Sequence, residues 1–141
     1  MALIGRMKRI HDRLSTGLQK VFAAHGLNGA SFDVLATLRR SGEPYALSPS
    51  ELVEWTMVTS GTMTNRLDRL ESAGLIERRP NPKDGRGSVV ALTDQGLRLI
   101  DQVVSEHVTN QHALVSGLDA ASMAQLDCLL KDWLAALDEE T

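Results

Sequence analysis

Two groups of polar residues in the middle of the chain have the chemistry to bind nucleic acid. The first is a stripe of hydroxyl, amide and guanidinium groups at helical spacing, made by Thr62, Asn65, Arg66 and Arg69. In a major groove, guanidinium groups can pair with guanine and amides with adenine. The second is the loop RRPNPKDGRGSVV at residues 78–90, with four cations and one anion. Because exposed helices often carry such residues, the stripe alone does not decide between solvent and DNA.

Patterns of catalysis and metal binding are missing from the sequence. The histidines do not have metal-ligand spacing, and no nucleophile-elbow or phosphate-loop motif occurs. The single cysteine, Cys128, has apolar neighbours that disfavour a reactive thiolate, so a redox sensor stays open only as an alternative. We expect no enzyme, no cofactor and no metal.

Charge is divided between the two halves of the chain. The net charge of the 141 residues is −3, but residues 1–90 sum to +4 and residues 91–141 to −7. A molecule with this division can present a basic face to a polyanion. No apolar run is long enough for a membrane span, and basic residues interrupt the N-terminal apolar stretch. We expect a cytoplasmic protein with no membrane partner.

Two short helices must position the stripe. The stretch LSPSELVEWT begins a helix, because Ser48 is an N-cap, Pro49 favours the first helical position and Glu51 completes a capping box. After a turn of a few residues, Thr59 or Ser60 caps the next helix. This second helix directs three residues toward the core: Met63, Leu67 and Leu70. Two helices joined so tightly indicate a helix-turn-helix.

A β-hairpin is expected next. Gly74 ends the helix, and the segments LIERR and SVVAL both have the composition of strands. Pro80 and Pro82 stiffen the loop between them, and Asp84-Gly85 supplies a turn that can adopt a positive φ. A hairpin that follows a helix-turn-helix is a wing, with the basic loop at its tip.

Amphipathic helices surround this unit. The first 40 residues predict a long helix that ends near His25-Gly26 and a short one with Ser31 as candidate N-cap. Two more helices are expected after the hairpin, capped by Thr93 and Asp119. Their apolar stripes exceed what a small winged helix covers, so they are expected to pack against a second copy of the chain. A helical hairpin packed within one monomer is the alternative.

Residues 65–96, NRLDRLESAGLIERRPNPKDGRGSVVALTDQG, resemble the multiple antibiotic resistance regulator (MarR) family of winged-helix transcription factors. The family shows a recognition helix, a Gly-Leu-Ile/Val-x-Arg strand, an Asp-x-Arg wing tip and a Leu-Thr-x-x-Gly return. The resemblance implies that Arg86 enters the minor groove and that Arg69 belongs to the recognition helix. It also implies that Asp84 orders the wing by pairing with a neighbouring arginine. Gly85 departs from the family, which often has a second arginine there.

The cations of the loop divide by chemistry. An arginine on a narrow projection suits the minor groove of A·T-rich DNA, where the potential is most negative, which favours Arg86 independently. Arg78, Arg79 and Lys83 suit phosphates, which set affinity and salt dependence. For Arg78 and Arg79 a solvated strand edge is the alternative.

Together these patterns predict a mainly α fold with a small β-hairpin wing: a winged helix-turn-helix with N- and C-terminal dimerisation helices. Residues 1–141 form one MarR-like domain, with a DNA-binding lobe at 28–93 and dimerisation regions at 1–25 and 94–141. The predicted function is a sequence-specific transcriptional regulator, a homodimeric repressor on pseudo-palindromic double-stranded DNA. The predicted DNA-binding residues are Ser60, Thr62, Thr64, Asn65, Arg66, Arg69, Arg78, Arg79, Lys83, Asp84 and Arg86.

A small-molecule effector is expected to release the protein from DNA. It can do so only if it prefers a spacing of recognition helices that does not suit the operator. The resemblance implies a small aromatic or phenolic anion where dimer helices meet DNA-binding lobes, with His11, Arg13 and Trp55 as candidates by position. A winged-helix module that binds proteins instead of DNA, and a redox sensor through Cys128, are the alternatives.

Overall fold

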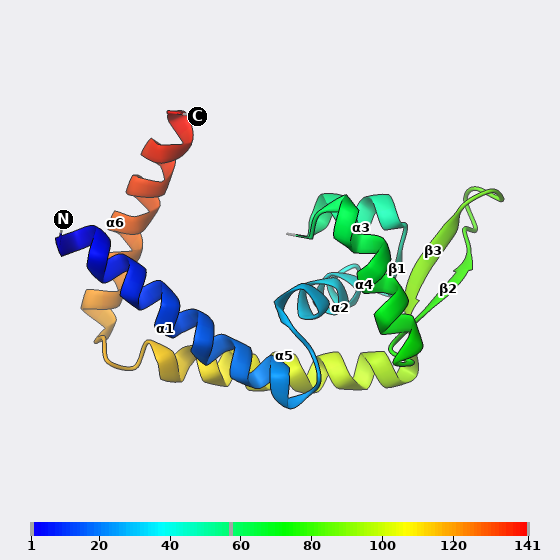
Figure 1. The fold of residues 1–141 in the computed structure, drawn as a ribbon, viewed down its shortest axis with the longest axis horizontal. Coiled ribbons are helices and arrows are strands. Elements are labelled where there is room, and N and C mark those ends of the chain that lie inside the picture. The colour runs from blue at the N-terminus through cyan, green and yellow to red at the C-terminus, as the bar shows by residue number, and fades with distance from the viewer. Residues whose placement is uncertain (1, 57, 141) are drawn as a thin grey trace.

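Six helices and three short strands form the part of the chain that this computed structural model describes, residues 2–56 and 58–140 (Figure 1). They are α1 (Ala2–Ala24), α2 (Gly29–Arg40), β1 (Ala46–Leu47), α3 (Pro49–Trp55), α4 (Ser60–Ser72), β2 (Ile76–Pro80), β3 (Ser88–Leu92), α5 (Asp94–Leu114) and α6 (Ala120–Glu139). This is the mainly α fold with a hairpin that the sequence predicts.

Helix starts follow from local side chains. The capping box of α3 is present, because Ser48 Oγ accepts from the Glu51 amide at 3.2 Å and Glu51 accepts from the Ser48 amide at 3.1 Å. The predicted N-cap Ser31 is wrong. Asn28 caps α2 instead, and its side chain accepts from the Ser31 amide at 2.9 Å. Ser31 is buried in the first turn of α2, where its backbone N–H has no acceptor within the helix. It therefore receives a cap from another residue and does not act as the cap.

The sheet is antiparallel with strand order β1-β3-β2. β2 and β3 pair from Ile76 opposite Leu92 to Pro80 opposite Ser88, so Pro80 lies in the strand and not in the tip. β1, only two residues long, pairs with the other edge of β3. The sequence did not predict β1, because two residues carry no alternation.

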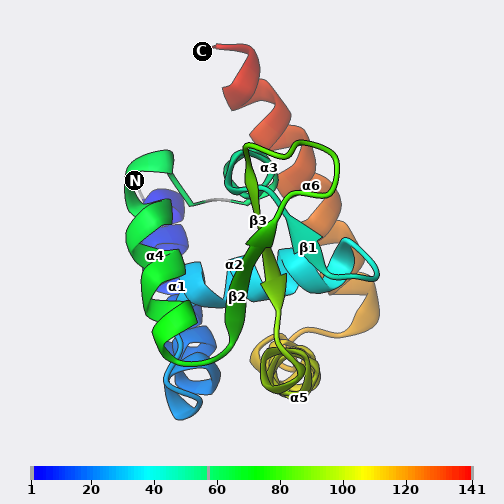
Figure 2. The same ribbon diagram turned by 90° about the vertical axis from the view of Figure 1, so that its right-hand side faces the viewer.

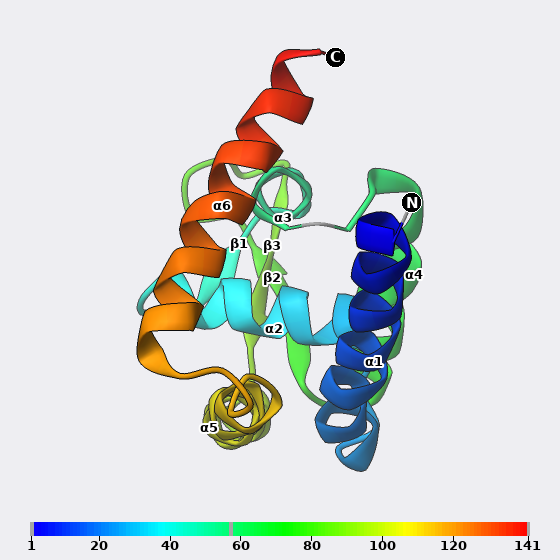
Figure 3. The same cartoon turned by 90° about the vertical axis from the view of Figure 1, so that its left-hand side faces the viewer.

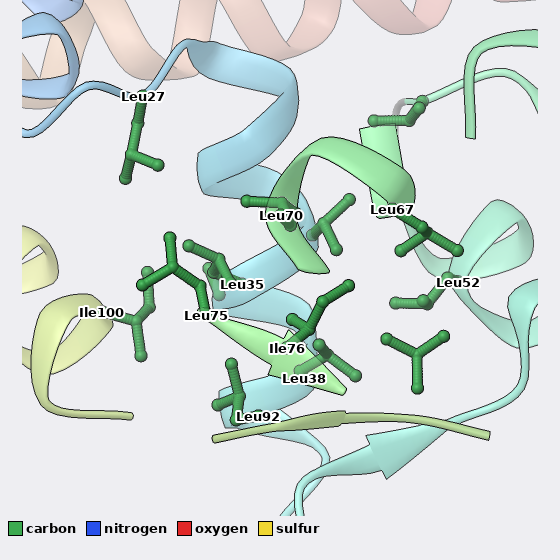
Figure 4. Close-up of a cluster of buried hydrophobic side chains, with 14 of the residues drawn as sticks. Leu27, Leu35, Leu38, Leu52, Leu67, Leu70, Leu75, Ile76, Leu92 and Ile100 are labelled. Atoms are coloured by element: carbon green, nitrogen blue, oxygen red, sulfur yellow. The ribbon is translucent and has the colours of Figure 1, made fainter. Parts of the chain in front are cut away.

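One apolar core holds these elements together. Fully buried side chains from α2, α3, α4, β2 and α5 meet in it, among them Leu35, Leu52, Leu67, Ile76 and Ile100 (Figure 4). Such burial stabilises the fold by about 1.5–3 kcal/mol for each large aliphatic side chain. The three residues of α4 predicted to face the core are confirmed as buried. Their position fixes which faces of α4 remain outside.

A backbone crossing joins the end of α4 to the start of α5. Gly74 has φ +76° and ends α4, and the Leu75 amide donates to the Leu70 carbonyl at 3.1 Å. Thr93, the N-cap of α5, donates from its hydroxyl to the Gly74 carbonyl at 2.6 Å and from its amide to the Leu75 carbonyl at 3.1 Å. A Cβ on Gly96 would lie 1.9 Å from the Leu75 carbonyl oxygen. We call this crossing, at residues 74, 75, 93 and 96, the α4–α5 joint.

The outer helices leave much apolar surface uncovered. α1 crosses α5 closely, and Asn110 on α5 donates to the Gly17 carbonyl at 2.9 Å. Figure 3 looks along α5 and shows α1 and α6 standing on either side of the molecule. None of the residues of α6 is buried. Large apolar side chains stay exposed on these two helices and the turn before α6: Leu3, Ile4, Ile10, Leu118, Met123, Leu126, Leu129, Leu134 and Leu137.

Candidate nucleic-acid interface

α4 and the β2–β3 hairpin lie beside each other at the end of the molecule away from α6 (Figures 1 and 2). The exposed side chains of α4 include hydroxyl, amide and guanidinium groups, and they are those of Ser60, Thr62, Thr64, Asn65 and Arg69. Most of the predicted stripe is therefore open to solvent, and two of its members, Thr62 and Arg69, line hollows on the side of α4 that faces α1 and α2.

Arg66 does not project with the rest of the stripe. It is half-buried, and its Nε is buried without a hydrogen-bond partner in the described part of the chain. Its side chain lines a hollow beside the turn that joins α1 to α2. This follows from helical geometry, because Arg66 lies next to the buried face made by Met63, Leu67 and Leu70. The geometry therefore favours Asn65 and Arg69 over Arg66 as groups that reach bases.

Arg78 ties the hairpin to the helix. Its guanidinium lies 2.8 Å from a carboxylate oxygen of Asp68 and 2.6 Å from one of Glu71, both on α4. The hydrogen bond with Asp68 raises the pKa of Arg78 above its already high ordinary value, so the guanidinium stays charged at physiological pH. We call Arg78, Asp68 and Glu71 the Arg78 clasp. Because both carboxylates hold this guanidinium, its predicted phosphate contact would have to displace them.

The other cations of the hairpin are placed differently. The Arg79 side chain pairs with Glu77 of the same strand. Lys83 and Arg86 are exposed at the tip, and within residues 2–56 and 58–140 neither side chain is seen in an ion pair. These two are the cations most available to a polyanion, and sequence reasoning had selected both.

The tip is ordered by its own backbone. The Asp84 side chain accepts from the Arg86 amide at 3.1 Å, and the Asp84 carbonyl accepts from the Gly87 amide at 3.1 Å. The implied pairing of Asp84 with a neighbouring arginine side chain was wrong for the residues described here. The turn at Asp84-Gly85 does not use the positive φ that glycine permits, because the glycines with positive φ in the described chain are Gly26, Gly42 and Gly74.

The position of Gly85 has room for an arginine side chain. A Cβ there would meet no atom within 4 Å, and its backbone does not need glycine. We expect Gly85→Arg to tighten DNA binding roughly threefold to tenfold at low salt and to steepen the salt dependence by about one unit, since one more cation reaches phosphate. Fluorescence anisotropy across a salt series measures both quantities. Gly117→Arg, in an open turn remote from the hairpin, is the control, and an equal gain for both variants would contradict the prediction.

The predicted effector residues do not come together in the single chain. The His11 side chain is 78% exposed on α1, and Trp55 is 52% exposed at the end of α3. Arg13 lines only a shallow groove made by residues of α1. No hollow found among the described residues contains two of these three candidates.

A hollow that the sequence did not reveal lies where α1, α2, α4 and α5 meet. Its volume is about 570 Å³, and Phe22, Phe32 and His107 form its aromatic wall. The two phenyl rings stack at 4.5 Å, and the imidazole lies 4.9 Å from the Phe32 ring. Burial lowers the pKa of His107, and its Nδ1 is buried without a described partner. We call it the aromatic hollow. Its residues are too far apart in sequence for spacing to connect them.

The α3–α4 pair and the hairpin define a winged helix-turn-helix, the class of DNA-binding proteins to which this chain belongs. More narrowly, the chain belongs to the MarR family of transcriptional regulators. The model of the MarR family matches residues 25–87. The HTH-type transcriptional regulator PecS of Dickeya dadantii is 43% identical over 130 residues, which cover 92% of this chain and 78% of PecS. The multiple antibiotic resistance protein MarR of Escherichia coli is 33% identical over 132 residues, covering 92% and 86% of the two chains.

Solved structures confirm the fold class. Apo MarR of E. coli has a TM-score of 0.74 at 31% identity, over 92% of this chain and 96% of that chain. A mutant of the same protein complexed with operator DNA has a TM-score of 0.75 at 31% identity, over 95% and 94%. BpsR of Bordetella bronchiseptica, whose DNA binding is described as regulated by 6-hydroxynicotinic acid, has a TM-score of 0.76 at 26% identity, over 92% and 90%.

Other classes of site find no support among the described residues. No three His, Cys, Asp or Glu side chains there gather as a metal site would require. Cys128 is exposed on α6, and the sequence holds no second cysteine for a disulfide within one chain. None of the described helices combines the length and the apolar character needed to cross a membrane.

Proposed function

We propose that the protein is a homodimeric repressor that places two copies of α4 on a pseudo-palindromic operator. The observation that carries the proposal is the uncovered apolar surface of α1 and α6, because α6 buries none of its residues within one chain. A helix with that much exposed apolar side-chain area is expected to be covered by a second copy. Residues 1–25 and 94–141 would then form the dimer, and residues 28–93 the DNA-binding lobe.

In this proposal α4 and the hairpin tip contact different grooves of the DNA. Ser60, Thr64, Asn65 and Arg69 of α4 would face the major groove, where side chains distinguish base pairs. Arg86 would enter the minor groove, with Asp84 holding its backbone in place. The remaining predicted residues would have supporting roles. Arg78 would hold the hairpin through the clasp, and Arg79 and Lys83 would contact phosphates. Thr62 and Arg66 would lie beside the residues that reach bases. Two-fold symmetry would separate the half-sites by about 34–36 Å.

A small aromatic or phenolic molecule is the proposed effector, and the aromatic hollow, whose lining includes Asp33 and no lysine or arginine, supports its planar body better than His11, Arg13 or Trp55 do. The stacked rings of the hollow offer faces on which a planar ligand can lie. Thr59 and Thr62, at the start of α4, also line the hollow. An occupant would therefore contact both the helices of the proposed dimer and α4, the helix proposed to enter the major groove. A ligand bound there could bias the position of α4, which linkage requires of an effector. Regulation of BpsR by 6-hydroxynicotinic acid is in line with this class of ligand.

Selection of bound duplexes from a random pool tests DNA recognition directly. We expect enrichment of an inverted repeat whose half-sites are centred about one helical turn apart. A pool without enrichment, together with no salt-dependent affinity for duplex DNA, would instead favour a module that binds proteins.

The roles of the cations can be separated by three substitutions. Arg86→Ala should weaken binding about tenfold, mainly to operators with A·T-rich flanks, because the minor-groove contact is lost. Arg69→Ala should relax base preference near the half-site centre, and Lys83→Ala should reduce the salt slope by about one unit. Binding titrations with altered flanks and salt measure these effects. Arg98→Ala, exposed on α5, is the matched control, and identical profiles for the three variants would contradict the division of roles.

A further inference from the structure

Four cations lie along one side of α1. They are exposed, and they fall within about 60° of one another around the helix axis, since each residue advances by about 100°. They are Arg6, Arg9, Arg13 and Lys20. The three arginines and Ile10 line a shallow groove that contains no carboxylate. None of the four cations forms an ion pair with another described residue. We call them the basic edge.

The basic edge is unfavourable on a chain that stands alone. Like charges three and four residues apart on a helix repel each other, as Arg9 does with Arg6 and with Arg13. Asp12, the only acidic residue of α1, pairs with His11 and not with a member of the basic edge. Arginine keeps its charge at any physiological pH, so the repulsion persists until an anionic surface covers the edge.

The last helix carries the complementary charge. With its two caps, α6 has six acidic residues and one lysine. Asp132 and Glu139 are exposed and seven residues apart, so they lie on one side of α6, beside the uncovered Leu129. Lys131, the only cation of α6, lies about 90° away from them around the axis. We call Asp132 and Glu139 the acidic edge.

The two edges match in spacing. Seven residues separate Arg6 from Arg13 and Arg13 from Lys20, and the same interval separates Asp132 from Glu139, about 10 Å along a helix axis. Two ion pairs can therefore form at once where one edge lies along the other. Within one chain the edges do not meet, because α1 and α6 stand on either side of the molecule (Figure 3).

A second copy of this chain fits the basic edge better than a nucleic acid does. The edge borders the exposed apolar residues Leu3 and Ile10, which a phosphate backbone would leave uncovered. The N-terminal half of α1 also lies at the end of the molecule away from the hairpin (Figure 1). In a two-fold dimer, a contact between α1 of one copy and α6 of the other is made twice.

We propose that the basic edge of each protomer lies along the acidic edge of its partner, so that charge selects the partner and sets the register of the two chains. The inference rests on the homodimer proposed above and adds what distinguishes a second copy from another protein with an apolar helix. Apolar stripes supply affinity with little discrimination. Charges beside them favour one alignment and repel chains that lack the complementary pattern.

Charge reversal tests this pairing in the full-length protein. The α1 variant, Arg6→Glu/Arg9→Glu/Arg13→Glu, turns the basic edge acidic, and the α6 variant, Asp132→Lys/Glu139→Lys, turns the acidic edge basic. We expect each variant alone to dimerise at least about tenfold more weakly than the wild type in analytical ultracentrifugation at low salt, because attractive pairs become repulsive. The wild-type dimer should also weaken as salt is added.

A mixture of the two variants is the sharper experiment. In a heterodimer the acidic α1 of one variant faces the basic α6 of the other, and the two unchanged edges face each other, so both contacts are attractive again. We expect native mass spectrometry to show heterodimers in excess over both homodimers. Arg40→Glu/Arg98→Glu, which reverses exposed charges on α2 and at the start of α5, is the control and should dimerise as the wild type does.

The possible failures are distinguishable. The proposal is overturned if the mixture shows no excess of heterodimers, or if either variant dimerises as the wild type does. An α1 variant that stays dimeric but loses affinity for duplex DNA would assign the basic edge to nucleic acid instead. A wild-type protein that is monomeric at every concentration would overturn the homodimer as well as the pairing of edges.

Discussion

The double variant Leu126→Glu/Leu137→Glu should be a monomer that binds its operator at least about 100-fold more weakly than the wild-type protein. Both leucines lie on the same apolar stripe of α6, and both are exposed in the single chain, at 41% and 48%. In the proposed dimer they are covered, so two carboxylates would have to lose water in an apolar interface. The operator affinity falls when the dimer is lost. Two lobes that bind one duplex together gain a factor of about 10²–10⁴ in affinity over a single lobe.

Light scattering coupled to size-exclusion chromatography and operator titration measure the two effects. Gln125→Glu is the control, because residue 125 lies about 100° round the same helix from Leu126 and the change adds one of the two negative charges outside the apolar stripe. The fold of one chain should survive in the double variant, since neither leucine belongs to the core. A variant that stays dimeric would show that the proposed dimer does not use this stripe.

Gly96→Ala should lower the free energy of unfolding by about 3 kcal/mol or more. The added methyl group would lie 1.9 Å from the Leu75 carbonyl oxygen and 2.9 Å from its carbonyl carbon. Both are backbone atoms, so no side chain can move aside to make room. The same carbonyl accepts from the Thr93 amide at 3.1 Å, so relieving the clash would also break the α4–α5 joint.

Urea unfolding followed by circular dichroism measures this loss, at one protein concentration because dimerisation would contribute to stability. Gly117→Ala is the matched control, since a Cβ there would meet nothing within 4 Å. We expect that control to change stability by less than about 1 kcal/mol. If Gly96→Ala also lowered the free energy of unfolding by less than about 1 kcal/mol, that result would contradict the close packing seen at the α4–α5 joint.

Sequence patterns predicted the elements whose causes are local. The capping box of Ser48 and Glu51 is complete in residues 48–51, and the core face of α4 follows from spacing alone. The Leu-Thr-x-x-Gly return was noticed as a family motif, and the structure supplies its reason. Thr93 caps α5 and binds the Gly74 carbonyl, while Gly96 allows the backbone of Leu75 to approach.

Features that depend on distant partners were missed or misassigned. Arg78 had the side-chain type of a phosphate contact, but its partners Asp68 and Glu71 are ten and seven residues away across a turn. Asn28 and Ser31 are both good N-caps by type, and only the start of α2 decides between them. The aromatic hollow joins residues from 22 to 107, and no periodicity connects them.

The Arg78 clasp bears on the entropy of DNA recognition. A free hairpin would sample many orientations and lose that freedom on binding, at a cost in affinity. Two charged bonds from Arg78, one to each of two carboxylates on α4, restrict this freedom before any duplex arrives. These ion pairs therefore limit how far the hairpin can move relative to α4. If α4 and the hairpin bind DNA as proposed, binding will depend on the spacing between a major-groove sequence and the adjacent minor-groove tract, as well as on the bases in each.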